Sequence, residues 1–309
     1  MDGRQALQPV SCDLCGSKSF TPIFSAVDYN HAVSQERFQF VKCLQCGLVF
    51  QNPRIPPEKI GGYYPAAYED YRFGRKGISA RDIEALEHFK IRQLRAAVGE
   101  KRGRILDVGC GEAGFLLKCK GIGFTPYGCD YSLGEGARAA GKQRVHIKRG
   151  DFMNLQYPKK FFKVITFWHV LEHLANPRKA LVKARSLLAD DGVLIVAVPN
   201  ADGLQAKLFG KYWSHVDAPR HYYLFSTATM LMMLEASGFS NMEVDHLAFH
   251  YNAWGYGTSV LNALGLRARG TDNPSGLVKS VAMAVFSIPA YFEAAMQRGG
   301  TIVVNARKK

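Results

Sequence analysis

The sequence has no long apolar run. Its longest, VAMAVFSIPAYF at 281–292, has 12 residues and contains Pro289, whereas a helix that spans a bilayer needs about 20 apolar residues. The first residues, MDGRQALQPVSCDLCG, also lack the apolar core of a secretory signal. We therefore expect a cytoplasmic protein, with a helix in 277–298 as the candidate for peripheral membrane contact.

Acidic residues are scarce relative to basic ones. The chain of 309 residues has 26 Asp and Glu against 40 Lys and Arg, a formal net charge of +14. This excess favours an anionic partner such as a nucleic acid, a phosphorylated small molecule or an anionic membrane surface. Hydrophobic residues make up 47% of the chain, which is enough for a folded core and excludes a disordered chain.

Cysteine is sparse beyond the N-terminal region. Four of the seven cysteines form two C-x-x-C-G motifs, SCDLCG and KCLQCG, and the others are scattered. Two such turns can converge on one Zn²⁺ ion, and each glycine lets backbone amides point at sulfur. We predict a zinc ribbon with structural zinc, rather than redox pairs, because neither motif lies in a thioredoxin-like βαβ unit. The predicted ligands are Cys12, Cys15, Cys43 and Cys46.

Composition divides the chain into segments. Residues 51–77 are rich in Pro, Gly and Tyr, which is typical of a linker over the surface. A helix is predicted to begin near Ser79, with Asp82 in a variant of the capping box and an apolar face that includes Phe89. The predicted segments are a zinc ribbon at 1–55, a linker and leading helix at 56–103, and the main domain at 104–309.

From Arg104 onward, short apolar runs alternate with stretches of helical length. The runs are RILDVG, TPYGCD, VHIKRG, KVITFW and GVLIVAVP. This alternation predicts an α/β domain whose parallel sheet has helices on both faces. SNMEVDHL (240–247) and TIVVNARKK (301–309) would add two strands. An insertion at about 248–299 lies between them and is long enough to cover the ligand edge of the sheet.

One predicted strand runs into a turn with three glycines. The stretch ILDVGCGEAGF contains Asp107 at the strand end, then Gly109, Gly111 and Gly114. Missing side chains there let a ligand approach the backbone, and the spacing also matches a nicotinamide-dependent dehydrogenase. Further acids, Asp130 and Asp151, close the next two strands and argue against that alternative, because they would repel a pyrophosphate and suit a cationic cofactor.

The spacing of these motifs resembles class I S-adenosylmethionine-dependent methyltransferases over about 100–250. It is most similar to the ubiquinone-biosynthesis-like branch and its zinc-ribbon-bearing members of sugar and cell-envelope pathways. The resemblance implies a Rossmann-like seven-stranded sheet, with Asp107 near the methionine part of the cofactor, Asp130 on the ribose and Asp151 at adenine. The implied cofactor contacts are Asp107, Gly109, Cys110, Gly111, Asp130, Tyr131, Asp151, Phe152 and Trp168. The family usually has glycine where Ala113 stands.

The segment FWHVLEHL (167–174) follows the fourth strand of the domain, and the resemblance places His169 near the methyl acceptor. HVLEH also matches the zinc-protease pattern H-x-x-E-H, but we disfavour a protease because the motif follows a buried strand of an α/β sheet. A simpler interpretation is that Glu172 and His173 fix the start of a helix and a loop.

The segment YWSHVDAPRHYYLFS (212–226) resembles the acceptor-side loop of the same branch. Methyl transfer to a hydroxyl needs a group that takes up a proton, and a histidine of near-neutral pKa suits this role. We name His221 first and His169 second as the general base, with Asp217 orienting either one. The alternative is that His221 and Arg220 brace the loop against the sheet.

The predicted function is methyl transfer from S-adenosylmethionine to a small-molecule or lipid-linked acceptor, with a saccharide hydroxyl as the preferred acceptor. An RNA methyltransferase that uses the ribbon and the basic charge is a second hypothesis, and nucleic acid is disfavoured because the basic residues are spread along the chain. A scaffold that kept the fold without catalysis is a third. For 277–298, the alternative to membrane contact is packing between two helices of the insertion.

Overall fold

The computed structural model describes residues 7–65, 80–266 and 276–309. Its centre is a seven-stranded mixed sheet in the order β10-β11-β8-β7-β4-β5-β6. Strands β4 to β8 are parallel, whereas β11 runs antiparallel between β8 and β10. The predicted α/β class is confirmed, including the two added strands. The bounds are β4 Arg104–Val108, β5 Thr125–Asp130, β6 His146–Arg149, β7 Phe162–Trp168, β8 Leu188–Pro199, β10 Phe239–Asp245 and β11 Thr301–Lys308.

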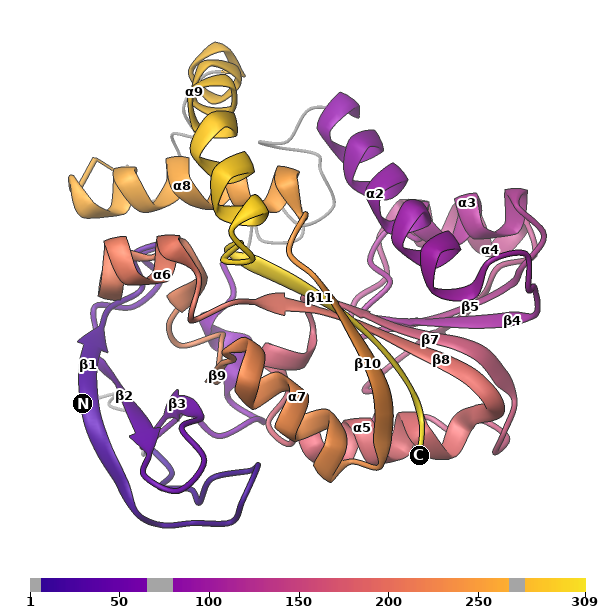
Figure 1. Cartoon of the computed structure of the whole chain (residues 1–309), viewed down its shortest axis with the longest axis horizontal. Helices are drawn as coiled ribbons and strands as arrows, with labels where there is room; N and C mark the ends of the chain where they lie inside the picture. The colour runs from indigo at the N-terminus through magenta and orange to yellow at the C-terminus, as the bar shows by residue number, and fades with distance from the viewer. Residues whose placement is uncertain (1–6, 66–79, 267–275) are drawn as a thin grey trace.

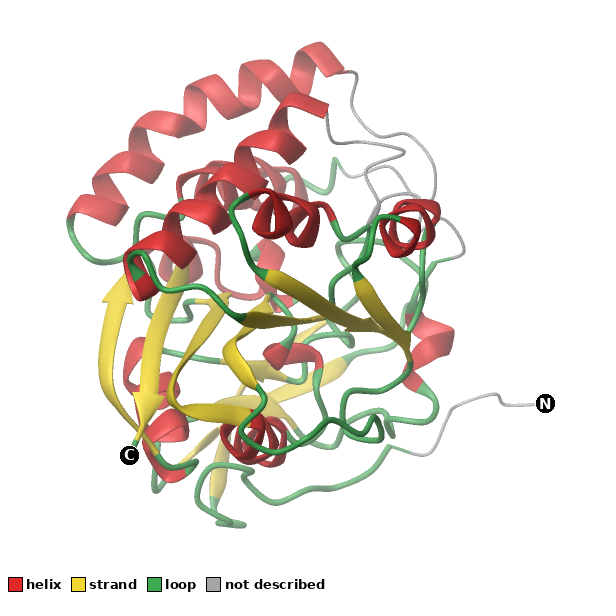
Figure 2. Ribbon diagram, turned by 90° about the vertical axis from the view of Figure 1, so that its right-hand side faces the viewer, coloured by secondary structure: helices red, strands yellow, loops and turns green. Residues whose placement is uncertain are grey.

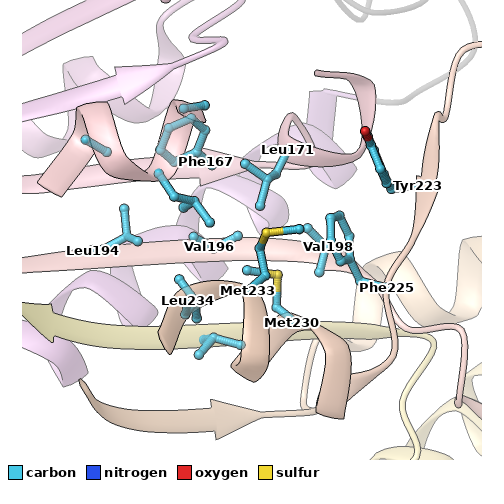
Figure 3. Packing of buried hydrophobic residues seen from close by; sticks show 14 of the residues in the cluster. Phe167, Leu171, Leu194, Val196, Val198, Tyr223, Phe225, Met230, Met233 and Leu234 are labelled. Carbon is cyan, nitrogen blue, oxygen red and sulfur yellow. The ribbon is translucent and has the colours of Figure 1, made fainter. Parts of the chain in front are cut away.

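Both faces of the central strands are buried. Successive side chains of a strand point to opposite faces, so Ile195 and Val196 of β8 belong to two separate cores. Figure 3 shows Met233 and Leu234 of helix α7 (Thr227–Ala236) packed beside Val196 in one of these cores. This double burial explains why the strands read as continuous apolar runs rather than as alternating ones.

Helices cover the sheet on its two faces (Figures 1 and 2). Helices α2, α3 and α4 contribute to one core, and α5 and α7 to the other. Helix α2 begins at Ala80, and the predicted cap Ser79 lies outside the described residues. The bounds are α2 Ala80–Val98, α3 Gly114–Gly121, α4 Glu135–Lys142, α5 Pro177–Leu187 and α7 Thr227–Ala236, with the short helices η2 Leu171–His173, α6 Leu204–Phe209, η3 Gly210–Tyr212 and η4 Ser214–Val216.

A second sheet joins the N-terminal region to a distant loop. Strands β1 Phe20–Ala26, β2 Phe38–Cys43 and β3 Val49–Gln51 form it together with β9 Tyr223–Leu224. The pairing of Val49 with Leu224 places the predicted acceptor-side loop against the N-terminal region. The beginning of the predicted surface linker is buried instead, because Gln51 Nε2 donates to the carbonyl of His221 at 2.6 Å and Arg54 Nη1 donates to Tyr223 Oη at 2.9 Å. A short helix, η1 Ile60–Tyr63, follows.

The insertion contains two helices, α8 Phe249–Ala263 and α9 Gly276–Ala295. They pack on each other through Tyr256 and Phe286, whose stacked rings are 5.9 Å apart. The opposite side of α9 exposes Val285, Ile288 and Phe292. In the part of the chain that the structure describes, no helix is both long and apolar enough to cross a membrane.

Candidate active site

The glycine turn joins β4 to α3 in a backbone conformation that side chains disfavour. Gly109 has φ +78°, and a Cβ there would overlap Val170 Cγ2. Gly111 also has a positive φ, of 52°. Ala113 is the N-cap of α3 with φ 63°, so this position is left-handed although it holds alanine instead of the glycine that the resemblance implies. The turn thus brings bare backbone to the carboxyl end of β4.

Asp107 is the next-to-last residue of β4, and its side chain is almost fully buried. Its Oδ1 accepts a hydrogen bond from Thr166 Oγ1 at 2.6 Å. Burial raises the pKa of Asp107 to about 7, although the positive charge of Lys90 and the bond from Thr166 oppose the rise. Lys90 of α2 also pairs with Glu87, at 3.5 Å. The sequence alone does not single out Lys90 and Glu87, but their polar side chains next to Phe89 on a helix face that packs inward are the signal that marks them.

The other two predicted acids lie at the same edge of the sheet. Asp130 closes β5, where its Oδ2 accepts from the amide of Gly111 at 3.0 Å and its Oδ1 from the amide of Ser132 at 3.1 Å. Asp151 follows β6, and burial together with this carboxylate raises the pKa of Tyr131 to about 12. Ligands of open α/β sheets bind at the carboxyl ends of the strands, and the acids converge there.

Three of the predicted cofactor residues are core side chains. Phe152 packs edge-on against Phe167 with 5.7 Å between ring centroids, and Trp168 packs in the same way against Phe115 at 5.8 Å. Cys110 belongs to the same core as Trp168. Trp168 Nε1 is buried and has no hydrogen-bond partner among the described residues. Their contact with a cofactor stays a prediction.

His169 follows β7 with φ 54°, a strained conformation for a histidine. Its Nδ1 lies 3.2 Å from Glu172 Oε1. Its Nε2 is buried, and no partner for it exists within the described ranges. The ring centroid of Tyr251 on α8 is 4.4 Å away, so the insertion covers this edge of the sheet. His169 therefore has one nitrogen oriented by a carboxylate and the other buried without a hydrogen-bond partner among the described residues.

Glu172 has no exposed surface and lies among histidines. Burial by itself would raise its pKa, but the hydrogen bond and charge of His169, with smaller effects of His221 and His173, lower the pKa of Glu172 to about 2. His173 Nδ1 donates to the carbonyl of Arg220 at 3.1 Å, and His221 Nδ1 donates to the carbonyl of His215 at 2.7 Å. The H-x-x-E-H motif spans the strand end and the short helix η2 instead of a protease helix.

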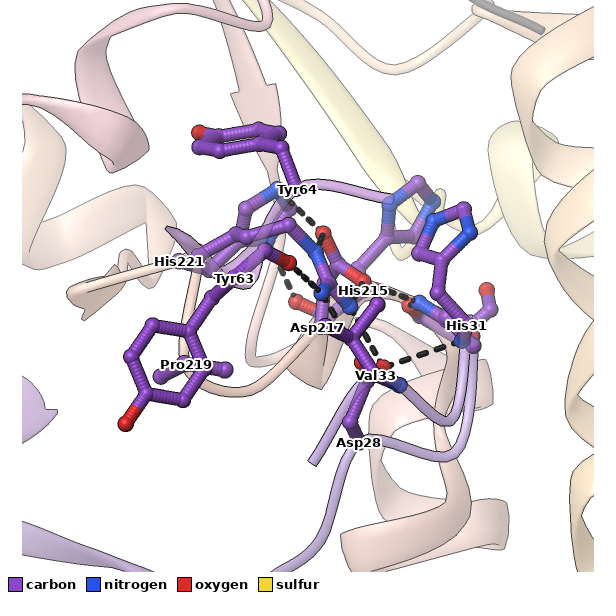
Figure 4. A network of polar contacts seen from close by, with 12 residues as sticks. Asp28, His31, Val33, Tyr63, Tyr64, His215, Asp217, Pro219 and His221 are labelled. Carbon is purple, nitrogen blue, oxygen red and sulfur yellow. Dashed lines mark hydrogen bonds and ion pairs between the residues drawn. The ribbon is translucent and has the colours of Figure 1, made fainter. Parts of the chain in front are cut away.

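Asp217 pairs with Arg220 more closely than with either candidate base. Arg220 Nη2 donates to Asp217 Oδ1 at 2.8 Å, whereas His221 Nε2 is 3.9 Å from Asp217 Oδ2. The fully buried Arg220 guanidinium also bonds both carboxylate oxygens of Asp28 in the N-terminal region. Figure 4 shows Asp28, Asp217 and His221 in this polar network. The geometry supports the bracing interpretation for Arg220, and the roles of His221, His169 and Asp217 in catalysis stay predictions.

The four N-terminal cysteines converge as a metal site requires. Their sulfur atoms all lie within 4.8 Å of one another, with Cys12 and Cys46 at 3.5 Å and Cys15 and Cys43 also at 3.5 Å. Both C-x-x-C turns end in a glycine of φ +78°, Gly16 and Gly47. Four thiols on two turns of the same geometry fit tetrahedral Zn²⁺, so the donor set is compatible with the predicted ribbon.

The protein has a Rossmann-like sheet with a glycine turn and three acidic residues at the carboxyl ends of its strands. This combination defines its class. A family model described as "Methyltransferase domain" matches residues 80–244, more than half of the chain. The chain belongs to this methyltransferase family. The predicted class of protein is thus confirmed, whereas the branch within it is not.

Individual proteins that are similar to this chain are also methyltransferases. Ajmaline N-methyltransferase of Rauvolfia serpentina is 29% identical over 106 residues, 31% of this chain and only 36% of that relative's length. The 1,6-didemethyltoxoflavin-N1-methyltransferase of Burkholderia thailandensis has a TM-score of 0.53 at 15% identity over 93% of this chain and 99% of that chain. Phosphoethanolamine N-methyltransferase 2 of Haemonchus contortus has a TM-score of 0.55 at 14% identity over 93% and 71%. Both structures contain S-adenosylhomocysteine, and at these identities they show the fold alone.

Proposed function

We propose that the protein transfers a methyl group from S-adenosylmethionine to the hydroxyl of a saccharide, free or lipid-linked. The observation that carries the proposal is the Glu172–His169 pair at the ligand edge of the sheet. A neutral hydroxyl loses its proton as its oxygen attacks, and His169 Nε2 is a buried acceptor held in place by a carboxylate.

The residues at this edge fit S-adenosylmethionine. When bound, it supplies a methyl group on a positively charged sulfur. Asp107 offers a buried carboxylate for the cofactor's ammonium group, and the Asp130 carboxylate can accept hydrogen bonds from the ribose hydroxyls. Gly109 keeps the turn tight, because a side chain there would overlap Val170. This acidic set would repel a pyrophosphate, which disfavours a nicotinamide cofactor.

The protein's own side chains can take up the proton that the proposed reaction releases. The acceptor oxygen bonds to the methyl carbon as the carbon–sulfur bond breaks, and the hydroxyl proton passes to His169 Nε2. The Glu172 carboxylate stabilises the resulting imidazolium, since it already accepts the Nδ1 hydrogen bond. Tyr251 of α8 covers the histidine and excludes water from the reacting atoms.

Charge and surface support a saccharide that carries phosphate. The net charge of +14 favours an anionic acceptor such as a nucleotide-linked or lipid-linked saccharide. The exposed apolar side of α9, with Val285, Ile288 and Phe292, would let a cytoplasmic protein rest on a membrane that holds the lipid-linked form.

An amine is the second candidate acceptor, because the relatives named above are N-methyltransferases. A neutral amine attacks with its own lone pair, so it depends less on a base at the moment of transfer. Replacement of His169 should therefore slow transfer to a hydroxyl far more than transfer to an amine.

Calorimetric titration with S-adenosylmethionine and S-adenosylhomocysteine is the first test. We expect both to bind the zinc-loaded protein. We expect Asp130→Ala to abolish binding, because the variant loses the carboxylate that accepts from the amide of Gly111 and that we propose for the ribose. Transfer of radioactive methyl to nucleotide-linked and lipid-linked saccharides then identifies the acceptor. The proposal fails if the folded wild-type protein binds neither compound.

A further inference from the structure

Glu172, His173 and His221 form a second cluster of metal-ligating groups, separate from the four cysteines. One ligand atom of each lies within 4.8 Å of those of the other two. Glu172 is fully buried and His221 nearly so. We propose that these three side chains bind a divalent transition-metal ion, such as Zn²⁺, through two imidazole nitrogens and one carboxylate oxygen.

Hydrogen bonds already set both histidines in the form that binds metal. A carbonyl oxygen can only accept, so His173 and His221 both carry their proton on Nδ1 when they donate to the carbonyls of Arg220 and His215. In the neutral rings the lone pair is then on Nε2. Histidine ligands of metals usually donate their other N–H to a carbonyl or carboxylate in this way.

The Glu172 carboxylate also has an oxygen available to bind a metal ion. Glu172 Oε1 accepts the bond from His169 Nδ1, while Oε2 is buried with no hydrogen-bond partner among the residues described. An orphaned carboxylate oxygen in a buried position is costly unless a cation binds it. A tetrahedral zinc site holds its ligand atoms roughly 3.3 Å apart, so small rotations of the three side chains would close the site.

The buried charges near the cluster also favour a bound cation. Glu172, Asp217 and Asp28 contribute three carboxylates, and within the described parts of the chain the guanidinium that pairs with two of them is that of Arg220. With neutral histidines, these four side chains carry two net negative charges, which one divalent ion neutralises. Three protein ligands would leave a coordination position open for water or an oxygen of the acceptor.

Metal content tests this inference without any acceptor or cofactor. The whole chain is stripped with a chelator and reconstituted with Co²⁺, and the bound ions are counted by elemental analysis. Cobalt on the cysteines gives strong sulfur-to-metal charge-transfer bands, whereas cobalt on nitrogen and oxygen gives only weaker visible bands. We expect two ions per chain in the wild type, one of each kind.

Two variants locate the second ion. Glu172→Gln and His173→Gln should each lose the ion that lacks thiolate bands and retain the thiolate-bound one, whose bands also show that the variant is folded. His88→Gln, at an exposed position of α2, should retain both. The inference is overturned if the wild type binds cobalt through thiolate alone, or if both variants retain the second ion. In either case, protonated histidines rather than a metal ion would neutralise the negative charge of the buried carboxylates.

Discussion

Asp107 is a carboxylic acid whose burial raises its pKa to about 7. The groups that face it are Lys90 and Glu87 of α2, Thr166 of β7 and Asp130 of β5. A cationic ligand binds the ionised form best, so binding should release a proton near neutral pH. We expect the affinity for S-adenosylmethionine to rise through about pH 7 and to fall roughly tenfold per unit below it.

Calorimetry in buffers of different ionisation enthalpy measures this proton release. Asp107→Asn should bind more weakly and without pH dependence across the same range. Equal affinity of the wild type at about pH 6 and about pH 8 would show that Asp107 is ionised throughout, and would contradict the raised pKa.

His169 combines a left-handed backbone with a hydrogen bond to a buried carboxylate. Asparagine accepts that backbone conformation more readily than most residues, so His169→Asn removes the base with little strain. We expect kcat for a hydroxyl acceptor to fall about 10²–10⁴-fold, while the affinity for S-adenosylmethionine stays unchanged. His146→Asn, at an exposed position of β6, is the control and should behave as wild type. Full activity of His169→Asn would point to another base or to an amine acceptor.

The turn between β4 and α3 is the element whose geometry depends most on glycine. A Cβ at Gly109 would strain a backbone of φ +78° and overlap Val170. We expect Gly109→Ala to lower the free energy of unfolding by roughly 2–5 kcal/mol, the combined cost of a left-handed alanine and local overpacking. Urea denaturation measures the change.

The matched control is Gly61→Ala in η1, where an added Cβ would meet nothing within 4 Å. It should change the free energy of unfolding by less than about 0.5 kcal/mol. Equal effects of the two substitutions would mean that the turn adapts to a side chain, and that the left-handed Ala113 nearby reflects a tolerant loop.

Elements were predictable wherever one local pattern decides them. The apolar runs of β4, β7 and β8 and the two C-x-x-C-G turns each carry their own signal, because burial on both faces and a positive φ act on neighbouring residues. Strand β9 is two residues long and has no such signal. It exists because Leu224 meets Val49 of β3, and no pattern in 212–226 indicates that pairing.

At the scale of the whole molecule, Arg220 ties the N-terminal region to the methyltransferase domain. Its guanidinium is fully buried between Asp28 and Asp217. Arg220→Met would leave two carboxylates without their cation, and we expect the free energy of unfolding to fall by about 3–5 kcal/mol. Denaturation followed by tryptophan fluorescence checks this.

Arg95→Met provides the comparison, because Arg95 is exposed on α2 and its loss should leave the denaturation midpoint unchanged. If Arg220→Met were as stable as this control, the buried ion pairs would not hold the two regions together. The N-terminal region would then be an independent module instead of part of the acceptor-side structure.

The sequence by itself determined the class of fold, the glycine turn, the acids at the strand ends and the two cysteine turns. Each of these depends on residues close together in the chain, where spacing and backbone conformation leave little choice. Only the tertiary structure decided that Glu172 lies among histidines from the residue after β7, from η2 and from the 212–226 loop, and that Lys90 of α2 lies near Asp107. These contacts form between segments that pack together only once the sheet and the insertion have assembled, so no local pattern records them.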